Sequence, residues 1–108
     1  MEASPSIILV TARVHLLLAS EGGRQGPVKS GYRPNHVFEL QPDLSRLQTY
    51  IGEIRFTEVP LIYPGETHLV TVAFLPMPVI EKYLQAGTKW WIYEVPKLVA
   101  VGEVVSIL

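Results

Sequence analysis

The sequence predicts an all-β domain, either an antiparallel sandwich or a closed barrel of about six strands. Its apolar segments are short, several of them alternate with polar residues at a period of two, and nine prolines and eight glycines separate them. The 108 residues are enough to bury one core but not two. We therefore expect a single domain over residues 1–108, with residues 1–6 as a loose N-terminal tail.

Composition and charge exclude several classes of protein. With 48% hydrophobic and 18% charged residues the chain is not of the disordered type. The formal net charge of −1 gives no overall attraction to nucleic acid or to anionic membranes, so such a contact needs a local patch. The absence of cysteine excludes disulfides and thiolate chemistry. The N-terminus, MEASPSIILV, lacks the basic segment of a signal peptide, and we expect a soluble, cytoplasmic protein that does not associate with membranes.

Two strands joined by a glycine-rich loop are predicted in the first half of the chain. Residues 7–18 alternate apolar and polar side chains, which predicts a strand with one buried face. A helix is the competing interpretation, because Leu16, Leu17 and Leu18 are good helix formers, but the β-branched residues before them favour a strand. The segment EGGRQGPVKSGYRP at 21–34 has the glycine and proline content of a loop, and residues 32–40 follow as a second strand.

The second half reads as four more strands and one short helical segment. Pro42-Asp43 centres a turn at 41–45, and Tyr63-Pro64-Gly65-Glu66 predicts a type II turn, because glycine supplies the positive φ of its third position. The remaining predicted elements are strands at 47–56, 68–74, 89–95 and 98–108, with Pro96-Lys97 between the last two, and one or two helical turns at 79–85.

No residue pattern indicates catalysis or metal binding. His15, His36 and His68 lie on separate predicted strands without the spacing of a metal site, so we expect structural or surface roles for them. The serines lack a nucleophile context, and the carboxylates are scattered singly. Trp90 and Trp91 point to opposite faces of one strand, so we expect one of them in the core. We predict no enzymatic activity, no cofactor and no nucleotide ligand.

The most specific pattern lies in the glycine-rich loop. EGGR at 21–24, Pro27 and GYRP at 31–34 closely resemble the start of the C-terminal β-barrel, the third domain, of elongation factor Tu. PGE at 64–66 and the ending VGEVVSIL resemble that family's turn before a valine-rich strand and its last strand. This resemblance extends over nearly the whole chain and implies a small closed antiparallel barrel of about six strands. Because no GxxxxGK[ST] phosphate loop is present, it also implies a stand-alone relative without the GTPase domain.

The sequence departs from the family pattern before the last strand. Where the family has an arginine-glutamate-glycine-glycine-arginine turn, this chain has Tyr93-Glu94-Val95-Pro96-Lys97, in which only Glu94 and Lys97 keep counterparts. In elongation factor Tu the barrel helps to grip the T-stem of aminoacyl-tRNA and packs against the GTPase domain and the exchange factor. The resemblance therefore implies a backbone-phosphate contact for Arg24 and a neighbouring polar contact for Gln25. The candidate RNA- or partner-binding residues are Arg24, Gln25, Lys29, Tyr32, Arg33 and Lys97.

Three interpretations of these residues stay open. The first is a non-catalytic binding module that contacts tRNA, another RNA or a translation-related protein through the loop. The second is a protein-interaction or antagonist domain without RNA binding, marked by an exposed apolar patch around Tyr83, Leu84 and a tryptophan. The third is that the loop glycines serve only the turn and barrel closure, while the cations solvate the loop.

Overall fold

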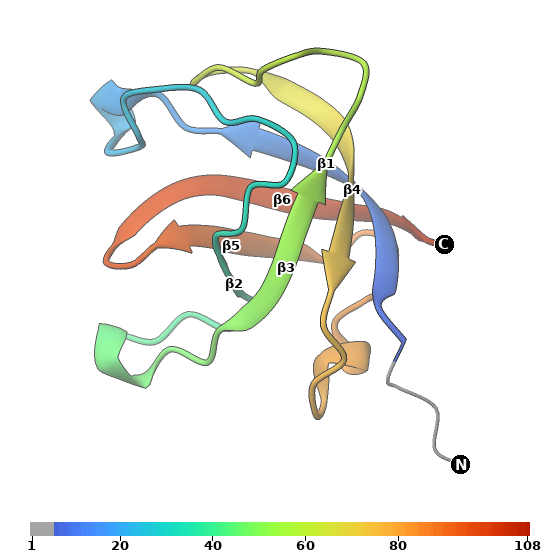
Figure 1. Cartoon of the computed structure of the whole chain (residues 1–108). Helices are drawn as coiled ribbons and strands as arrows, with labels where there is room; N and C mark the ends of the chain where they lie inside the picture. Colours follow the sequence, from blue (N-terminus) through green and yellow to red (C-terminus); the bar gives the residue numbers. More distant parts are fainter. Residues whose placement is uncertain (1–5) are drawn as a thin grey trace.

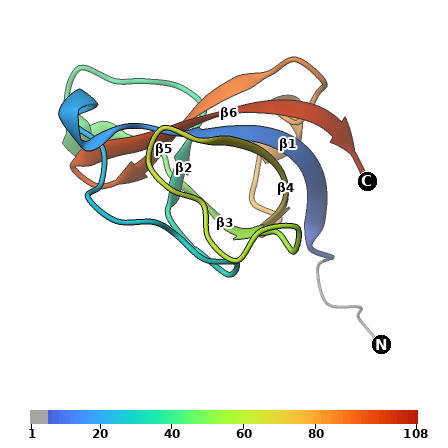
Figure 2. The same cartoon turned by 90° about the horizontal axis from the view of Figure 1, so that it is seen from above.

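The computed structural model describes residues 6–108 and arranges them as a closed antiparallel barrel (Figures 1 and 2). The strands are β1 (Ile8–Leu16), β2 (Asn35–Val37), β3 (Tyr50–Arg55), β4 (Thr67–Phe74), β5 (Lys89–Glu94) and β6 (Lys97–Ile107). Around the barrel their order is β1-β4-β3-β2-β5-β6. The predicted all-β class and the closed six-stranded barrel are confirmed. Of the expected N-terminal tail, residues 1–5 lie outside the described residues.

In strand β1, alternate side chains face the interior of the barrel, as the period of two in the sequence predicts. Val10, Ala12, Val14 and Leu16 are at most 3% exposed and face the interior. The strand ends at Leu16 rather than at the predicted Leu18, which is 45% exposed. The chain leaves the sheet there because the N–H of Leu18 is bonded to the Glu21 carboxylate at 2.8 Å, which starts the 3-10 helix η1 (Ala19–Glu21).

The next two predicted strands are also shorter than expected. The second strand, predicted at 32–40, spans only Asn35–Val37, because Pro34 has no N–H and Tyr32 makes only an isolated bridge to Ile54. The third, predicted at 47–56, is reduced to Tyr50–Arg55, and the 3-10 helix η2 (Leu44–Arg46) precedes it.

The helical segment predicted at 79–85 is a single 3-10 turn, η3 (Ile80–Lys82). The last two predicted strands form a tight hairpin in which Lys97, expected between them, is already paired with Glu94. The predicted turn at Tyr63–Glu66 is present: Gly65 has φ +94° and the Glu66 N–H is 3.0 Å from the Tyr63 carbonyl. No helix among the described residues is long and apolar enough to cross a membrane.

The centre of the core is an aromatic cluster around Trp90, which is 1% exposed. Its ring stacks on Phe38 at 5.6 Å and meets Phe74 edge-on at 6.0 Å, between ring centroids. Gly102 on β6 leaves room for the indole, since a Cβ there would lie 2.8 Å from two ring carbons. Trp91 lies partly exposed on the outer face, so the predicted division between the two tryptophans is confirmed.

His36 is the buried polar side chain of this core, with no exposed surface. Its Nδ1 accepts a hydrogen bond from Trp90 Nε1 at 3.0 Å, so Nε2 carries the proton and donates to the Gly52 carbonyl at 3.0 Å. Burial lowers the pKa of His36 to about 4. The neutral imidazole therefore joins β2, β3 and β5 from inside the barrel. Within residues 6–108, no group of three His, Asp or Glu side chains could hold a metal ion.

Candidate functional site

The glycine-rich loop is tied to the barrel at several points. Val28 pairs with Ile62, and Tyr32 pairs with Ile54. Gly23 packs against the backbone so closely that a Cβ there would lie 2.6 Å from the Leu17 carbonyl oxygen. The turn and barrel closure therefore account for part of the EGGR…GYRP pattern, while the side chains of the loop remain available for a further role.

Arg24, Tyr32 and Glu94 form a connected network beside this loop. The Arg24 guanidinium binds the Glu94 carboxylate at 2.8 Å and the Gly26 carbonyl at 3.0 Å, and it lies 5.3 Å from the centroid of the Tyr32 ring. The Tyr32 hydroxyl donates to the same carboxylate. Burial and this hydrogen bond raise the pKa of Tyr32 well above its usual value, so the hydroxyl stays protonated. The network fixes the direction of Arg24 while its side chain keeps 27% of its surface exposed.

A hollow of about 400 Å³ opens on this network. The residues that line it are Arg24, Pro27, Val28, Lys29, Ser30, Gly31, Tyr32 and Leu61. Lys29 is exposed and makes no salt bridge within residues 6–108. The hollow thus offers one oriented cation, one free cation and glycine-containing backbone, which together suit a phosphate group.

The other predicted residues lie around this hollow or away from it. Gln25 is exposed on the loop, and Lys97 neighbours the network through its strand partner Glu94. Arg33 is directed elsewhere: it binds Glu53 on β3 at 2.9 Å and lines a separate hollow of about 140 Å³. The structure therefore brings together Arg24, Lys29 and Tyr32, and it separates Arg33 from them.

Glu94 belongs to the network, although it is not among the binding residues predicted from the sequence. A signal for it was present, because Glu94 and Lys97 keep counterparts in a turn that otherwise departs from the family pattern. What the sequence did not reveal is its contact with Arg24 and Tyr32, which lie 70 and 62 positions away along the chain.

The exposed apolar patch that would mark the second interpretation is not formed around Tyr83 and Leu84. Leu84 is only 6% exposed, and Tyr83 stacks on Phe38 at 5.0 Å, with its hydroxyl donating to Glu39. Both residues complete the core at the end of the barrel.

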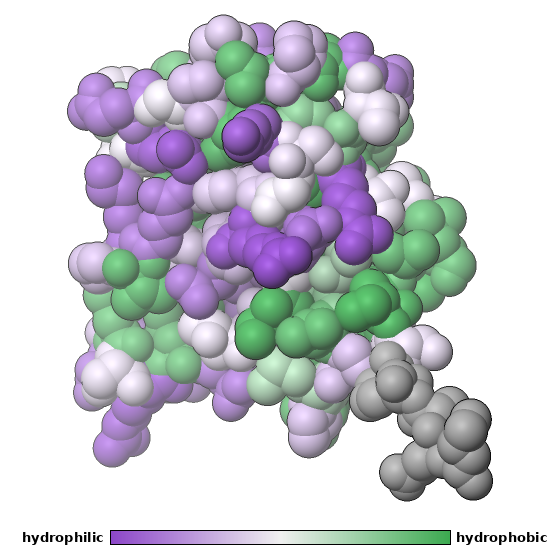
Figure 3. Space-filling model, in the orientation of Figure 1, coloured by the Kyte–Doolittle hydropathy of each residue, from purple (hydrophilic) through white to green (hydrophobic). Residues whose placement is uncertain are grey.

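A different apolar surface is exposed instead. Ile51, Leu75 and Ile7 are 53%, 39% and 43% exposed and lie side by side, since the Leu75 N–H donates to the Ile51 carbonyl and Phe74 pairs with Ile8. We call these three side chains the aliphatic row. Figure 3 shows hydrophobic surface below a band of hydrophilic residues on the side of the molecule that faces the viewer in Figure 1.

The comparisons with known proteins agree with the fold. No protein-family model matches the chain. The described residues form a closed antiparallel β-barrel, and the chain is similar to part of a translation factor. The chain is 31% identical over 98 residues to elongation factor Tu 2 of Streptomyces avermitilis, a match that includes 90% of this chain.

That match covers 22% of the relative, so the chain spans about a fifth of its length. The matched part is the C-terminal barrel of the relative and not its catalytic GTPase domain. The resemblance predicted from the sequence is confirmed.

Proposed function

We propose that this domain is a non-catalytic binding module that contacts the phosphate backbone of RNA, tRNA included, through the hollow at the glycine-rich loop. The observation that supports it is the placement of Arg24, Lys29 and Tyr32 around one open hollow of about 400 Å³. Elongation factor Tu, to which the chain is similar, is a translation factor, so a translation-related ligand fits this similarity.

The charges of the hollow decide how such a contact is made. Glu94 neutralises part of Arg24 and repels a phosphate placed directly against it. We therefore place the phosphate between Lys29 and the outer edge of the Arg24 guanidinium, with the Tyr32 ring behind it. Lys97 next to Glu94 and the polar Gln25 extend this surface along the RNA backbone.

Titration with bulk tRNA at low and moderate salt tests the proposal. We expect saturable binding that weakens with salt, and we expect Lys29→Ala to reduce the slope of log K against log salt by about one. Arg24→Ala weakens binding more, because it also frees the Glu94 carboxylate. Arg46→Ala on η2 is the matched control, since this exposed cation lies on a different loop. Arg33→Ala shows whether the bound RNA reaches β3. Equal effects of Lys29→Ala and Arg46→Ala would contradict the assignment.

The aliphatic row favours a second candidate function, binding of a protein partner without RNA. Three exposed aliphatic side chains in register across three neighbouring chain segments form an apolar surface that a protein can cover. Such binding is insensitive to salt and is weakened by Ile51→Lys, which lies outside the glycine-rich hollow. Absence of tRNA binding at low salt would favour this second function over the first.

A further inference from the structure

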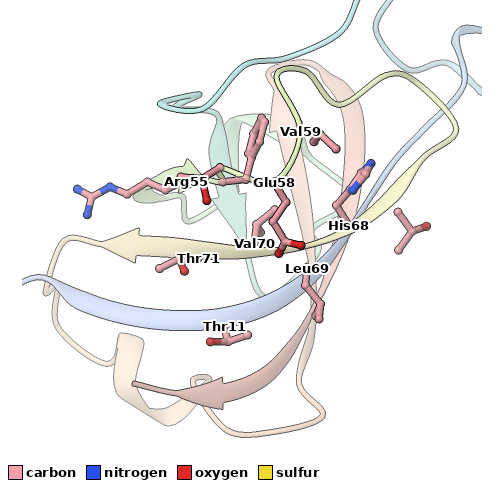
Figure 4. A pocket seen from close by; sticks show the side chains of 11 residues that line it. Thr11, Arg55, Glu58, Val59, His68, Leu69, Val70 and Thr71 are labelled. Carbon is pink, nitrogen blue, oxygen red and sulfur yellow. The ribbon is translucent and has the colours of Figure 1, made fainter.

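A hollow of about 630 Å³ lies beside β4 (Figure 4). It opens between the first half of this strand and the segment 56–59 that follows β3. None of its lining residues belongs to the glycine-rich hollow, so it is a separate surface.

At this hollow, part of strand β4 has no neighbouring strand on one side. Strand β1 pairs with β4 from Phe74 to Thr67. On the other side β3 pairs with β4 only from Phe74 to Thr71, because β3 ends at Arg55 and the chain then turns away. Residues 67–70 of β4 therefore have a strand neighbour on one side only.

The pairing of β4 with β3 determines which way the N–H and C=O groups of β4 point. In an antiparallel ladder successive residues turn their N–H and C=O groups to opposite neighbours. The N–H of Leu75 donates to Ile51 beside β3, so the odd-numbered residues of β4 face the β3 side. Thr71 is paired with Arg55 of β3, whereas the backbone N–H and C=O groups of Leu69 and Thr67 face the hollow. No backbone hydrogen bond joins these two residues to segment 56–59.

The side chains around this edge favour a positively charged ligand. Figure 4 shows Glu58 extending from the segment after β3 toward β4. Within residues 6–108 Glu58 makes no salt bridge, whereas Arg55 is held by Glu53 at 2.6 Å. The Leu69 side chain is 56% exposed. The hollow thus combines unpaired backbone groups with an uncompensated carboxylate.

We propose that the free edge of β4 binds an extended, basic peptide segment of a partner protein as a short added strand. The N–H and C=O of Leu69 pair with the backbone of the segment, and a lysine or arginine of the segment lies against Glu58. At roughly 3.4 Å per residue, the free edge over residues 67–70 accommodates a segment of about three or four residues. This inference goes beyond the proposed RNA contact and does not depend on it.

A nuclear magnetic resonance titration of the 15N-labelled protein with the synthetic peptide acetyl-Thr-Val-Lys-Val-Thr-amide tests the proposal. We expect saturable shifts of the Leu69 and Thr67 amides at millimolar peptide. We also expect the Leu69 amide to exchange with solvent faster than the His68 amide in the free protein, and to be slowed by the peptide. A Leu69 amide that is already protected in the free protein, or no shift at these two positions, would overturn the proposal.

Variants of both partners separate backbone pairing from other contacts. Leu69→Pro removes the N–H that faces the hollow and leaves the β1 ladder in place, so the peptide shifts disappear, whereas Leu69→Thr retains them. If Leu69→Pro fails to fold, a peptide N-methylated at the lysine and its two neighbours gives the same comparison. Glu58→Gln weakens binding by roughly two- to fivefold. Equal binding of the N-methylated peptide, or of a peptide with glutamate in place of lysine, would contradict the proposed mode.

Discussion

Acidification should destabilise this barrel, and the buried side chain of His36 should contribute strongly to the loss. The imidazole is fully buried and bonded on both sides, and burial lowers its pKa from the ordinary 6.5 to about 4. The folded state binds this proton less readily than the unfolded chain. The contribution of neutral His36 to the free energy of unfolding is therefore fully present above pH 6.5 and is lost as the pH falls toward 4. The difference between the two pKa values corresponds to about 3 kcal/mol.

The assay is urea denaturation followed by tryptophan fluorescence at pH 4, 5, 6 and 7, in the wild type and in His36→Gln. Glutamine can donate to the Gly52 carbonyl and accept from Trp90 without titrating. Asp43, Glu53 and Glu66, whose pKa values are lowered by their hydrogen bonds, contribute acid sensitivity equally to both proteins. We expect the wild type to lose about 3 kcal/mol more than the variant between pH 7 and pH 4. Parallel curves for the two proteins would refute the reasoning.

Three further predictions concern packing and tyrosine ionisation. Gly102→Ala places a Cβ 2.8 Å from the Trp90 ring and should cost about 1–3 kcal/mol in urea denaturation, whereas Gly26→Ala, with open space around it, should be nearly neutral. Gly65→Ala should lower the melting temperature by destabilising the turn by about 1 kcal/mol, because φ at this position is +94°. In a spectrophotometric titration, Tyr83 should ionise at about pH 12, because its hydrogen bond to Glu39 raises its pKa, and Glu39→Gln should bring this ionisation to lower pH.

Much of the fold could be predicted from local sequence. The alternation in β1 and β4, the proline-glycine turn and the tryptophan pair each follow from rules that act over a few residues. The lengths of the second strand and of the helical segment could not be predicted in this way. Tertiary contacts decide them: Pro34 interrupts pairing, and Ile80 is fully buried within a single 3-10 turn.

The candidate site was only partly predictable for the same reason. The loop pattern located Arg24, Lys29 and Tyr32, which the structure brings to one hollow. The ion pairs of Arg24 with Glu94 and of Arg33 with Glu53 join residues far apart in the chain, and no spacing in the sequence encodes them. The open edge of β4 left no sequence signal either, because it depends on where β3 ends.

The most direct test of RNA binding by the glycine-rich loop is a map of amide shifts on addition of bulk tRNA, recorded at low and at moderate salt. The account predicts that the amides of residues 24–32 shift most at low salt and return toward their free positions when salt is added. Shifts confined to the aliphatic row or to β4 at both salt concentrations, or no shifts at low salt, would contradict it.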